Sequence, residues 1–491
     1  MTVPKLRIQD VNQVAVNADG RFVLYWMTAF RRPGWNFSLQ RAVEHARELK
    51  KPLVVLETLR TGYQWASDRM HHFAIQGMAD NARAFEKTKA LYYPYVEPET
   101  GDGEGLLEQL ANHACVVVTD DFPCLRFPEV VALAAEHLEV RLEKVDSNGL
   151  LPLRAADRVF LRAYDFRRFL QQALRDHLDE FPEANPLSRS RIPESAGLPS
   201  DIRKRWPPTD VEAMAVSPGR LLDFPIDHSV AVTCTRGGIV AANKTLDEFL
   251  QSKLPVYGAE RNQPDHEVTS GLSPFLHFGH ISTHDVFARL MQKEDWTAAD
   301  VADRATGSAA DWWGVGPGAE SFLDELITWR EIGFNMCWQR EDYDQFESLP
   351  EWAQRTLEEH VGDQRPAVYS LAEFEAAATH DPLWNAAQTQ LVREGRIHNY
   401  LRMLWGKKIL HWTETPQMAL EVMIQLNNKY AIDGRNPNSY SGIFWVLGRY
   451  DRAWGPEREV FGKVRYMTSR NTARKFRVKP YVEKFGPSAG V

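Results

Sequence analysis

Three tryptophans in the C-terminal half of the chain have the residue type and spacing that could carry an electron. Trp405 and Trp412 are seven residues apart in a stretch with helical periodicity, which puts them on one helix face about two turns apart. Trp384 lies on a separate helical stretch that precedes them. Indoles also fill protein cores because they bury a large area, and that alternative stays open from the sequence. The chemical interpretation is a relay along which an electron hops from ring to ring.

A polar, turn-rich segment follows these tryptophans. It covers residues 426–438 with the sequence LNNKYAIDGRNPN, between apolar helical patterns. Polar groups that become buried need hydrogen-bond partners. A cofactor ring with several heteroatoms would supply those partners, so the segment favours a bound cofactor.

A second polar segment, TSGLS at residues 269–273, stands just before a helical stretch. Hydroxyls and exposed amides at a helix start are the arrangement that receives an anionic phosphate. The Ser-Pro pair that follows from residue 273 is equally an ordinary helix start, so both interpretations remain open. His277 and His280 come next, but no third ligand lies near them, and we predict no metal site.

The end of the chain is locally basic, although the formal net charge of the whole chain is −8. From Arg449 onward, eleven Lys or Arg residues stand against four Asp or Glu residues, a local charge of +7. Such a strip is an ordinary solvated surface in many proteins. Because it is interleaved with Tyr466, Phe476 and Tyr481, it also fits a contact with a nucleic-acid phosphate backbone.

The elements that must position these residues fall into two halves. The first 150 residues alternate β-branched apolar runs with amphipathic helical stretches. Strands are predicted at residues 22–27, 52–56, 91–96, 115–119 and 140–145, and helices at residues 38–49, 68–87 and 127–138. This alternation predicts a doubly wound parallel sheet with helices on both faces. No GxGxxG follows the first strand, so dinucleotide binding in the usual manner is not supported.

The second half of the chain follows a proline-rich stretch and has only helical patterns. Residues 181–225 carry eight prolines, a composition that suits a surface connector better than the interior of a strand or helix. Helices are predicted at residues 245–253, 283–291, 319–337, 382–394, 398–412 and 416–429. We therefore predict an α/β domain over residues 1–180, an interdomain connector over residues 181–225 and an all-α domain over residues 226–491.

Length and composition exclude several classes of protein. The chain has 491 residues, of which 44% are hydrophobic and 25% charged, which is typical of globular proteins. No apolar run approaches the roughly 18 residues that cross a bilayer, and the start MTVPKLRIQD is too charged for a signal peptide. Four cysteines without a CxxC pair indicate a reducing compartment and are expected in the core. We expect a cytoplasmic protein, nucleoid-associated in a prokaryote, that acts as a monomer without a membrane partner.

Several motifs together resemble one known family. TSGLSPFLHFGHIS, ELITWRE, HDPLWNAAQ, YLRMLWGKKILHW, LNNKYAIDGRNPN and DRAWG…GKVRYM resemble the class II cyclobutane pyrimidine dimer photolyases of the photolyase/cryptochrome superfamily. The resemblance extends from residue 23 to residue 467. It implies a Rossmann-like antenna domain at the N-terminus and an all-α domain at the C-terminus that holds FAD in a U shape.

The resemblance also implies roles for residues around FAD. Asn427 would face nitrogen N5 of the flavin, and Arg402 would pair with Asp433 beside the isoalloxazine, an environment that favours the reduced anionic ring. Contacts to the phosphates and the ribose would come from Tyr257, Thr269, Ser270, Gly271, Leu272 and Ser273. Trp405, Trp384 and Trp412, in that order outward, match the relay that photoreduces the flavin.

The substrate that the resemblance implies is UV-damaged DNA. Glu325 matches the acid that hydrogen-bonds the pyrimidine dimer, and Trp329 and Trp445 match the aromatic walls that hold it. Further substrate contacts would come from Met403, Arg261 and Asn262. Reduced FAD would absorb blue light and donate an electron to the flipped-out dimer, which splits and returns the electron. The implied activity is that of a light-dependent carbon–carbon lyase in DNA repair.

The sequence departs from the family pattern at three places. Asn436 stands where the family usually has Asp, Ser439 stands where it usually has Gly, and the segment at residues 449–452 is one residue shorter. These changes alter loops near the cofactor and remove no residue with a central role.

Two rival functions and one further chromophore accompany this interpretation. The nearer rival is a cryptochrome-like FAD photoreceptor without repair activity, and the more distant one is an RNA-linked or structural nucleotide-binding protein. Glu325, Trp329 and Trp445 favour repair, because a sensor has no need of a dimer pocket. A deazaflavin antenna is implied by the resemblance alone, and an empty antenna site is the alternative.

Overall fold

The computed structural model describes residues 2–188 and 190–486 of the chain. Its contacts divide the chain into two compact units that interleave along the sequence. The first unit comprises Met1–Ala156, Leu174–Asp247 and Leu272–Asp295, and the second comprises Asp157–Ala173, Glu248–Gly271 and Trp296–Val491. The contiguous division at residues 180 and 225 stays a prediction.

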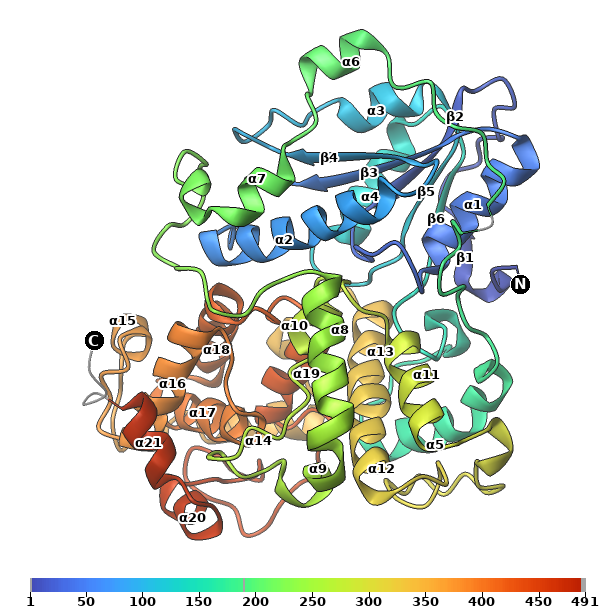
Figure 1. Ribbon diagram of the computed structural model, residues 1–491. Coiled ribbons are helices and arrows are strands. Elements are labelled where there is room, and N and C mark those ends of the chain that lie inside the picture. The colour runs from blue at the N-terminus through green and yellow to red at the C-terminus, as the bar shows by residue number, and fades with distance from the viewer. Residues whose placement is uncertain (1, 189, 487–491) are drawn as a thin grey trace. The chain divides into compact units, whose positions relative to one another are not determined.

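The first unit is built on a six-stranded sheet with the order β1-β6-β5-β2-β3-β4 (Figure 1). Its strands are β1 (Ile8–Asp10), β2 (Phe22–Met27), β3 (Leu53–Leu59), β4 (Leu91–Val96), β5 (Ala114–Asp120) and β6 (Leu142–Val145). All neighbouring pairs are parallel except β1 with β6, which is antiparallel. The predicted doubly wound sheet is confirmed. The edge strand β1 was not predicted, since three residues carry no readable alternation.

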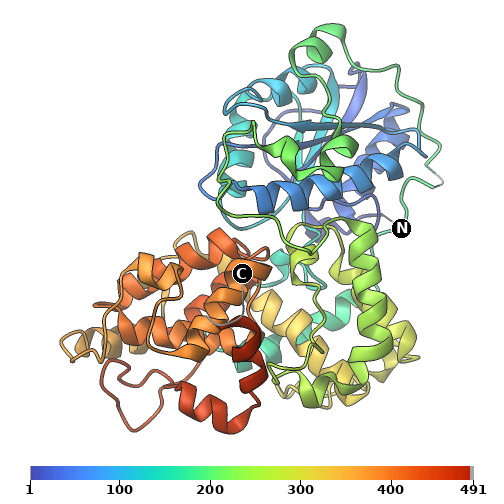
Figure 2. The ribbon, with the colours of Figure 1, turned by 60° about the vertical axis from the view of Figure 1, so that its left-hand side comes forward.

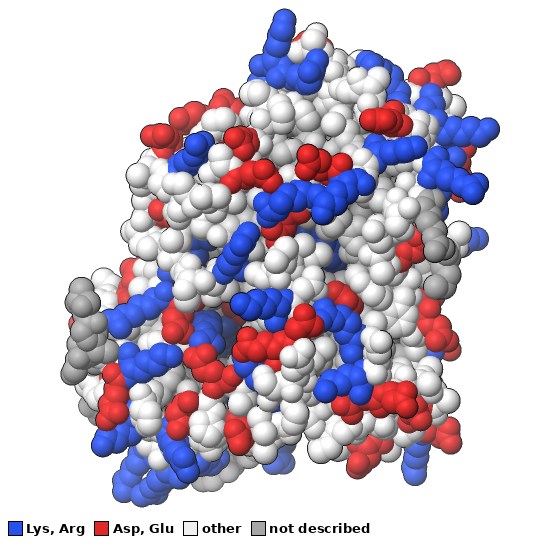
Figure 3. Space-filling model, in the orientation of Figure 1, with Lys and Arg blue, Asp and Glu red and all other residues white. Residues whose placement is uncertain are grey.

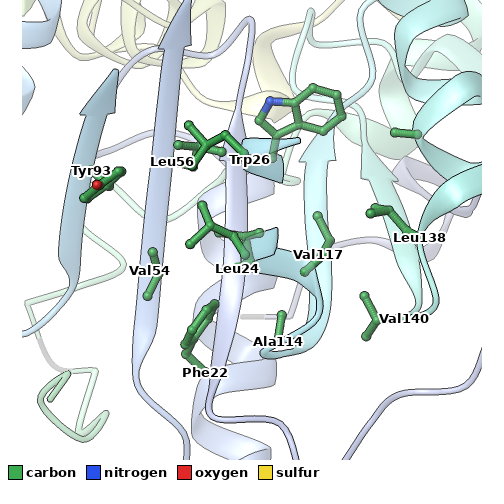
Figure 4. Packing of buried hydrophobic residues seen from close by; sticks show 14 of the residues in the cluster. Phe22, Leu24, Trp26, Val54, Leu56, Tyr93, Ala114, Val117, Leu138 and Val140 are labelled. Atoms are coloured by element: carbon green, nitrogen blue, oxygen red, sulfur yellow. The ribbon is translucent and has the colours of Figure 1, made fainter. Parts of the chain in front are cut away.

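The central strand β2 is buried on both faces, as an uninterrupted apolar run requires. Phe22, Leu24 and Trp26 point to one face, where they pack with residues of β3, β5 and β6 (Figure 4). Val23 and Tyr25 point to the other face and join a second core cluster. The period of two along a strand thus divides one sequence run between two cores.

Helices cover both faces of this sheet. One face packs against α1 (Phe37–Leu49) and the end of α2 (Asp68–Phe85). The other face packs against α3 (Leu106–Ala111), α4 (Phe127–His137) and α6 (Ser200–Arg205). The remaining helices of this unit are α7 (Val211–Val216), α8 (Ile239–Glu248), which ends at the unit boundary, α10 (Ser273–His277) and α11 (Thr283–Lys293).

The composition of the proline-rich stretch had led us to expect a connector without helices, but the structure contains two there. The stretch holds α6 and α7, each six residues long. Pro199 is the N-cap of α6, and Pro207 and Pro208 follow its end. Proline is tolerated at the start of a helix and prevents its continuation, so closely spaced prolines limit the length of these helices without excluding them.

One carboxylate organises the loop that follows β2. Asp120, at the end of β5, accepts hydrogen bonds from the backbone N–H groups of Thr28, Ala29 and Phe30 at 2.7–2.9 Å. It also accepts from the hydroxyl of Tyr25 at 2.8 Å. The neighbouring carboxyl ends of β2 and β5 are therefore held together by a fully buried anion.

We expect Asp120→Ala to lower the free energy of unfolding by about 3–5 kcal/mol, since three buried N–H groups lose their acceptor. Thermal unfolding followed by circular dichroism measures the loss. Asp19→Ala, which removes an exposed carboxylate from a loop, is the control and should have little effect. Equal stability of the two variants would contradict the assigned role of Asp120.

The second unit is helical, and its described residues contain no strand (Figure 2). Its helices are α5 (Ala163–Ala173), α9 (Leu254–Glu260), α12 (Pro317–Leu323), α13 (Arg330–Gln339), α14 (Glu351–Glu359), α15 (Leu371–Glu375), α16 (Pro382–Glu394), α17 (Asn399–Trp412), α18 (Pro416–Tyr430), α19 (Pro437–Val446), α20 (Ser469–Lys475) and α21 (Lys479–Phe485). The prediction of an all-α C-terminal half is confirmed. The predicted helices at residues 382–394, 398–412 and 416–429 correspond to α16, α17 and α18.

Helix α19 lies close to two neighbours, α13 and α17. A Cβ atom on Gly333 of α13 would come within 2.5 Å of Ser441 Oγ and 2.7 Å of the Pro437 carbonyl oxygen. A Cβ atom on Gly406 of α17 would come within 2.6 Å of a methyl group of Val446. Only glycine fits at these two contacts, so they set the distance of α19 from both neighbours.

Three of the four cysteines lie in the core, as expected, but Cys234 is exposed. It stands in a loop between α7 and α8, where no packing surface covers the side chain. Within residues 2–188 and 190–486, no helix combines the length and apolar character needed to cross a membrane.

Candidate functional site

The structure places most of the predicted site residues in the second unit. They are Tyr257, Arg261, Asn262, Thr269, Ser270, Gly271, Glu325, Trp329, Trp384, Arg402, Met403, Trp405, Trp412, Asn427, Asp433 and Trp445. Leu272 and Ser273 belong to the first unit. The helices of the second unit bring these residues together in four groups.

The first group lies on a π-helical turn between α12 and α13. This turn, η7 (Asp324–Trp329), carries both Glu325 and Trp329. A π turn holds more residues than an α turn, so residues four apart come close to one face. Single π turns occur frequently at functional sites, and this one carries a carboxylate and an indole four residues apart.

Glu325 pairs with Arg261, which follows the end of α9. The Arg261 guanidinium also lies 5.7 Å from the ring centre of Tyr257. Desolvation raises the pKa of the Glu325 carboxyl above its ordinary value, and the positive charge of Arg261 partly opposes that rise. The Glu325 side chain nevertheless keeps 29% of its surface accessible. The carboxyl is therefore accessible to a ligand.

The second group is an aromatic pair. The rings of Trp329 and Trp445 have their centres 5.3 Å apart at 39°, and both are partly exposed. Trp445 comes from α19, so the close packing of α19 on α13 sets this separation. Two partly exposed indoles form a surface on which a planar base can stack.

Sequence reasoning missed the continuation of this aromatic surface. The Arg465 guanidinium lies 5.7 Å from the ring centre of Trp445 and 4.4 Å from that of Trp454. Asp451 holds Arg465 and Trp454 in place, since it accepts hydrogen bonds from Arg465 Nε at 3.0 Å and from Trp454 Nε1 at 3.1 Å. Arg452 lies 4.7 Å from the ring centre of Trp454. The DRAWG and GKVRYM motifs contain these residues and were the signal that could have identified them.

The third group surrounds the ends of α17 and α18. Arg402 on α17 donates to Asp433 Oδ1 at 3.3 Å, and the two side chains are 20% and 15% exposed. Asn427 on α18 is buried and donates its amide hydrogens to Ser439 and Asn428. The predicted Arg402–Asp433 ion pair is therefore present in the structure.

This third group fits a ring rich in heteroatoms, such as the flavin of FAD. It offers a guanidinium donor, a carboxylate acceptor and the carbonyl oxygen of Asn427, all from partly or wholly buried side chains. Met403, one residue after Arg402, is 9% exposed and supplies an apolar side chain beside them. Flat polar rings bind where a few fixed polar groups stand among apolar ones.

The fourth group is the set of three tryptophans, all buried. Trp384 Nε1 donates to the carbonyl oxygen of Trp405 at 3.0 Å, and Trp405 Nε1 donates to Gln388 Oε1 at 2.9 Å. The ring centres of Trp384 and Trp412 are 6.0 Å apart. The order Trp405, Trp384, Trp412 is thus continuous in space, although the same contacts also pack a core.

The remaining predicted residues are placed less specifically. Thr269, Ser270 and Gly271 are partly or wholly exposed in a loop, where Gly271 has φ of +69°. Leu272 is buried, and Ser273 begins the five-residue helix α10. Asn262 is partly exposed beside Arg261. The described residues contain no cluster of three or more His, Cys, Asp or Glu side chains that could hold a metal ion.

The basic C-terminal strip differs in one respect from the sequence-based prediction. Arg449 is fully buried, where it donates to the Tyr343 carbonyl oxygen at 2.9 Å and to Ser348. Its place in the chain beside the apolar end of α19 explains the burial. Other basic side chains are exposed, namely Arg452, Arg458, Lys463, Arg470, Arg474, Lys475, Arg477, Lys479 and Lys484. Lys and Arg side chains gather over α20 and α21 at the lower left of Figure 3, with acidic residues between them.

The fold, with an α/β unit and a helical unit, is that of a photolyase. A crystal structure of a bacterial class III photolyase from Agrobacterium tumefaciens matches 96% of this chain and 88% of its own, with a TM-score of 0.67 and 16% sequence identity. No family model matches the chain.

Relatives with known names are similar over nearly the full length. A deoxyribodipyrimidine photo-lyase from Methanothermobacter thermautotrophicus is 36% identical over 479 residues, which cover 97% of each chain. One from Potorous tridactylus is 31% identical and covers 99% of this chain and 85% of its own. The chain belongs to the deoxyribodipyrimidine photo-lyase family, and the prediction that it is an enzyme of this kind is confirmed.

Desolvation of Glu325 should make stability depend on pH. A carboxyl whose pKa is raised on folding binds more protons in the native than in the unfolded state, so the free energy of unfolding falls as pH rises between the two pKa values. Arg261→Met removes the charge that limits this rise. In this variant we expect the free energy of unfolding to keep falling to higher pH than in the wild type. At pH 8 it should be lower than that of the wild type by on the order of 1–2 kcal/mol.

Chemical unfolding between pH 4.5 and 8 measures this decline. The control is Arg355→Met, which removes a surface ion pair with Glu351 and should shift the curve little at any pH. Parallel pH profiles for wild type and Arg261→Met would show that Arg261 does not hold the charge of Glu325.

Proposed function

We propose that this enzyme is a class II cyclobutane pyrimidine dimer photolyase that repairs UV-damaged DNA by light-driven electron transfer. The observation that carries the proposal is the placement of Glu325 and Trp329 on one π-helical turn, with the ring centre of Trp445 5.3 Å from that of Trp329. A carboxyl with a raised pKa beside two partly exposed indoles suits a flipped pair of bases with carbonyl groups. The full-length relatives named photo-lyase support the same conclusion.

FAD is the cofactor we propose for the third group. Arg402, Asp433 and Asn427 would hold the isoalloxazine ring, and the segment at residues 269–273 with Tyr257 would hold the phosphates and ribose. When bound and reduced, FAD supplies the photoexcited electron. The Arg402 guanidinium stabilises negative charge nearby, which favours the reduced anionic ring.

The substrate groups act on the dimer in three ways. Trp329 and Trp445 replace the stacking that the dimer loses when it leaves the helix. Glu325 in its neutral form donates a hydrogen bond to a base carbonyl and stabilises the negative charge that develops there. Substrate binding removes further water from around Glu325, and desolvation favours the neutral carboxyl. Arg261, Asn262 and Met403 complete the proposed pocket.

The surface around the pocket provides the DNA contact. Trp454, Arg465 and Arg452 extend the aromatic pair outward in alternating rings and guanidinium groups. Such an array stacks bases and neutralises phosphates together. The exposed basic side chains of α20 and α21 add positive charge that favours binding to DNA.

Three finer assignments rest on the resemblance and the composition. We propose a monomer that acts in the cytoplasm, or on the nucleoid in a prokaryote. A deazaflavin antenna is proposed for the first unit. Because Asp120 already accepts the three backbone N–H groups after β2, a phosphate of that chromophore would need other donors. An absorption spectrum of the purified protein tests for the chromophore.

Repair is tested by illumination of a dimer-bearing oligonucleotide with the chemically reduced protein and measurement of absorbance at 260 nm. We expect repair by the wild type. Glu325→Gln should keep FAD and lower the repair yield per photon by about twofold to tenfold, because an amide shares no proton with the dimer anion. Glu260→Gln, which changes a carboxylate paired with His266, serves as control.

The outcomes of this experiment separate the two leading functions. A wild-type protein that binds FAD without repairing the dimer would be a photoreceptor, and the repair proposal would fail. Unchanged yield in Glu325→Gln would leave repair intact and reject the role of the carboxyl.

The relay is tested by Trp405→Phe, since phenylalanine is much harder to oxidise than an indole. We expect the variant to bind FAD but to fail to photoreduce it with an external donor, while repair survives after chemical reduction. Its stability should fall by about 1–3 kcal/mol, because the buried Gln388 loses the donor it has in the wild type.

Trp206→Phe is the matched control for the relay variant. Trp206 is buried in the first unit and donates from Nε1 to the Asp102 carbonyl oxygen at 2.7 Å, so its replacement removes a comparable packing contact and hydrogen bond. It should leave photoreduction unchanged. Photoreduction at the wild-type rate in Trp405→Phe would return the three tryptophans to a purely structural role.

A further inference from the structure

Two asparagines at the end of α18 and two residues of α19 form one buried hydrogen-bond network. Asn427 Nδ2 donates to Ser439 Oγ at 2.7 Å and to Asn428 Oδ1 at 3.3 Å. Asn428 Nδ2 donates to the Tyr440 hydroxyl at 3.1 Å. Asn427, Asn428 and Ser439 are 2%, 0% and 3% exposed. A donor left unpaired in such a place costs free energy, so these contacts hold the side chains firmly.

One backbone group determines which way the amide of Asn428 faces, and this in turn constrains the amide of Asn427. The N–H of Arg435 donates to Asn428 Oδ1 at 2.9 Å, and a backbone N–H can only donate. Asn428 must therefore turn its oxygen toward Arg435, and this oxygen also faces Asn427. If the side-chain amide of Asn427 were turned over, its oxygen would face the side-chain oxygen of Asn428. The NH2 group of Asn427 must point into the network.

Ser439 completes this arrangement. Its hydroxyl accepts the shorter of the two bonds that Asn427 donates, so both amide hydrogens of Asn427 have acceptors. The oxygen Oδ1 is then the only hydrogen-bonding atom of this side chain that remains. No donor from the described residues reaches it, and the atom keeps a small accessible surface, so a ligand can reach it.

We propose that Ser439 is a positioning residue that holds Asn427 Oδ1 outward as a fixed hydrogen-bond acceptor. Such an acceptor selects a ring nitrogen that carries a hydrogen over a ring nitrogen that has only a lone pair. The inference rests on the proposed function, in which Asn427 faces nitrogen N5 of FAD. That nitrogen carries a hydrogen in the reduced ring and none in the oxidised ring. A fixed acceptor therefore favours the reduced cofactor, and a glycine at position 439 would provide no side chain to fix it.

The test is Ser439→Ala, which removes the acceptor and leaves one amide hydrogen of Asn427 free to turn elsewhere. We expect the ratio of affinities for reduced over oxidised FAD to fall about threefold to tenfold, the value of one neutral hydrogen bond. For a two-electron couple this is a decrease in midpoint potential of about 15–30 mV. Spectroelectrochemical titration of the bound flavin measures it, and fluorescence titration of the apoprotein measures the affinity for oxidised FAD.

Two further variants separate positioning from general packing. Ser441→Ala removes another buried serine hydroxyl from the same helix, on the side that faces Gly333 of α13, and should leave the potential unchanged. Ser439→Thr keeps a hydroxyl and should restore most of the wild-type potential. A general loosening of α19 would shift the potential in both alanine variants and would overturn the proposal.

The outcomes also separate this proposal from the proposed function. If both wild type and Ser439→Ala bind FAD with the same potential, the positioning role is rejected while the photolyase function stands. If the wild-type protein binds no FAD, the proposed function and the positioning role fail together.

Discussion

The close approach of α19 to α13 and α17 is the constraint on which the second unit depends. Gly333 and Gly406 permit it, since a Cβ at either position would overlap atoms of α19. The same helix carries Ser439 at its start and Trp445 at its end. Its distance from α13 sets the separation of the Trp445 and Trp329 rings, and its distance from α18 sets the bond from Asn427 to Ser439. Two missing methyl groups thus permit the close approach of the helix that carries both Ser439 and Trp445.

The π turn that carries Glu325 adds a second constraint. A π turn has less favourable geometry than the α-helix around it, and it persists where surrounding packing holds it in place. Here α12 and α13 continue on either side, and Arg167 of α5 pairs with Asp324 at 2.8 Å. The turn brings a carboxylate and an indole to one face, and burial raises the pKa of that carboxylate. An irregular helical turn and local desolvation therefore occur at the same six residues.

The three buried tryptophans show how one set of contacts serves both packing and chemistry. Each indole N–H of Trp384 and Trp405 has a fixed acceptor, which limits the movement of the rings. A rigid ring in a dry environment changes its surroundings little when its charge changes, because few dipoles are free to reorient. Core packing and electron transfer thus require the same features here, so the fold does not distinguish between them and only a redox measurement does.

The sequence by itself determined those elements whose signals are local. The apolar run of β2 and the alternation of strands and helices predict a doubly wound sheet. Helix α16 begins and ends where the sequence indicates, because Asp381 caps its first turn, Pro382 follows, and Gly395 takes a left-handed conformation at its end. The motifs also identified the Arg402–Asp433 pair. Capping and periodicity act within a few residues, so the sequence alone contains them.

Tertiary structure decided what depends on distant partners. The bounds of helix α19 were not predicted, because its sequence, PNSYSGIFWV, does not separate a polar from an apolar face and neighbours on several sides bury it. The pairing of three-residue β1 with β6, the burial of Arg449 and the stacking of Arg465 between Trp445 and Trp454 likewise arise from residues far apart in the chain. The direction of the Asn427 amide depends on Arg435 and Ser439 together. Such features follow from which surfaces meet, and a local pattern contains no information about that.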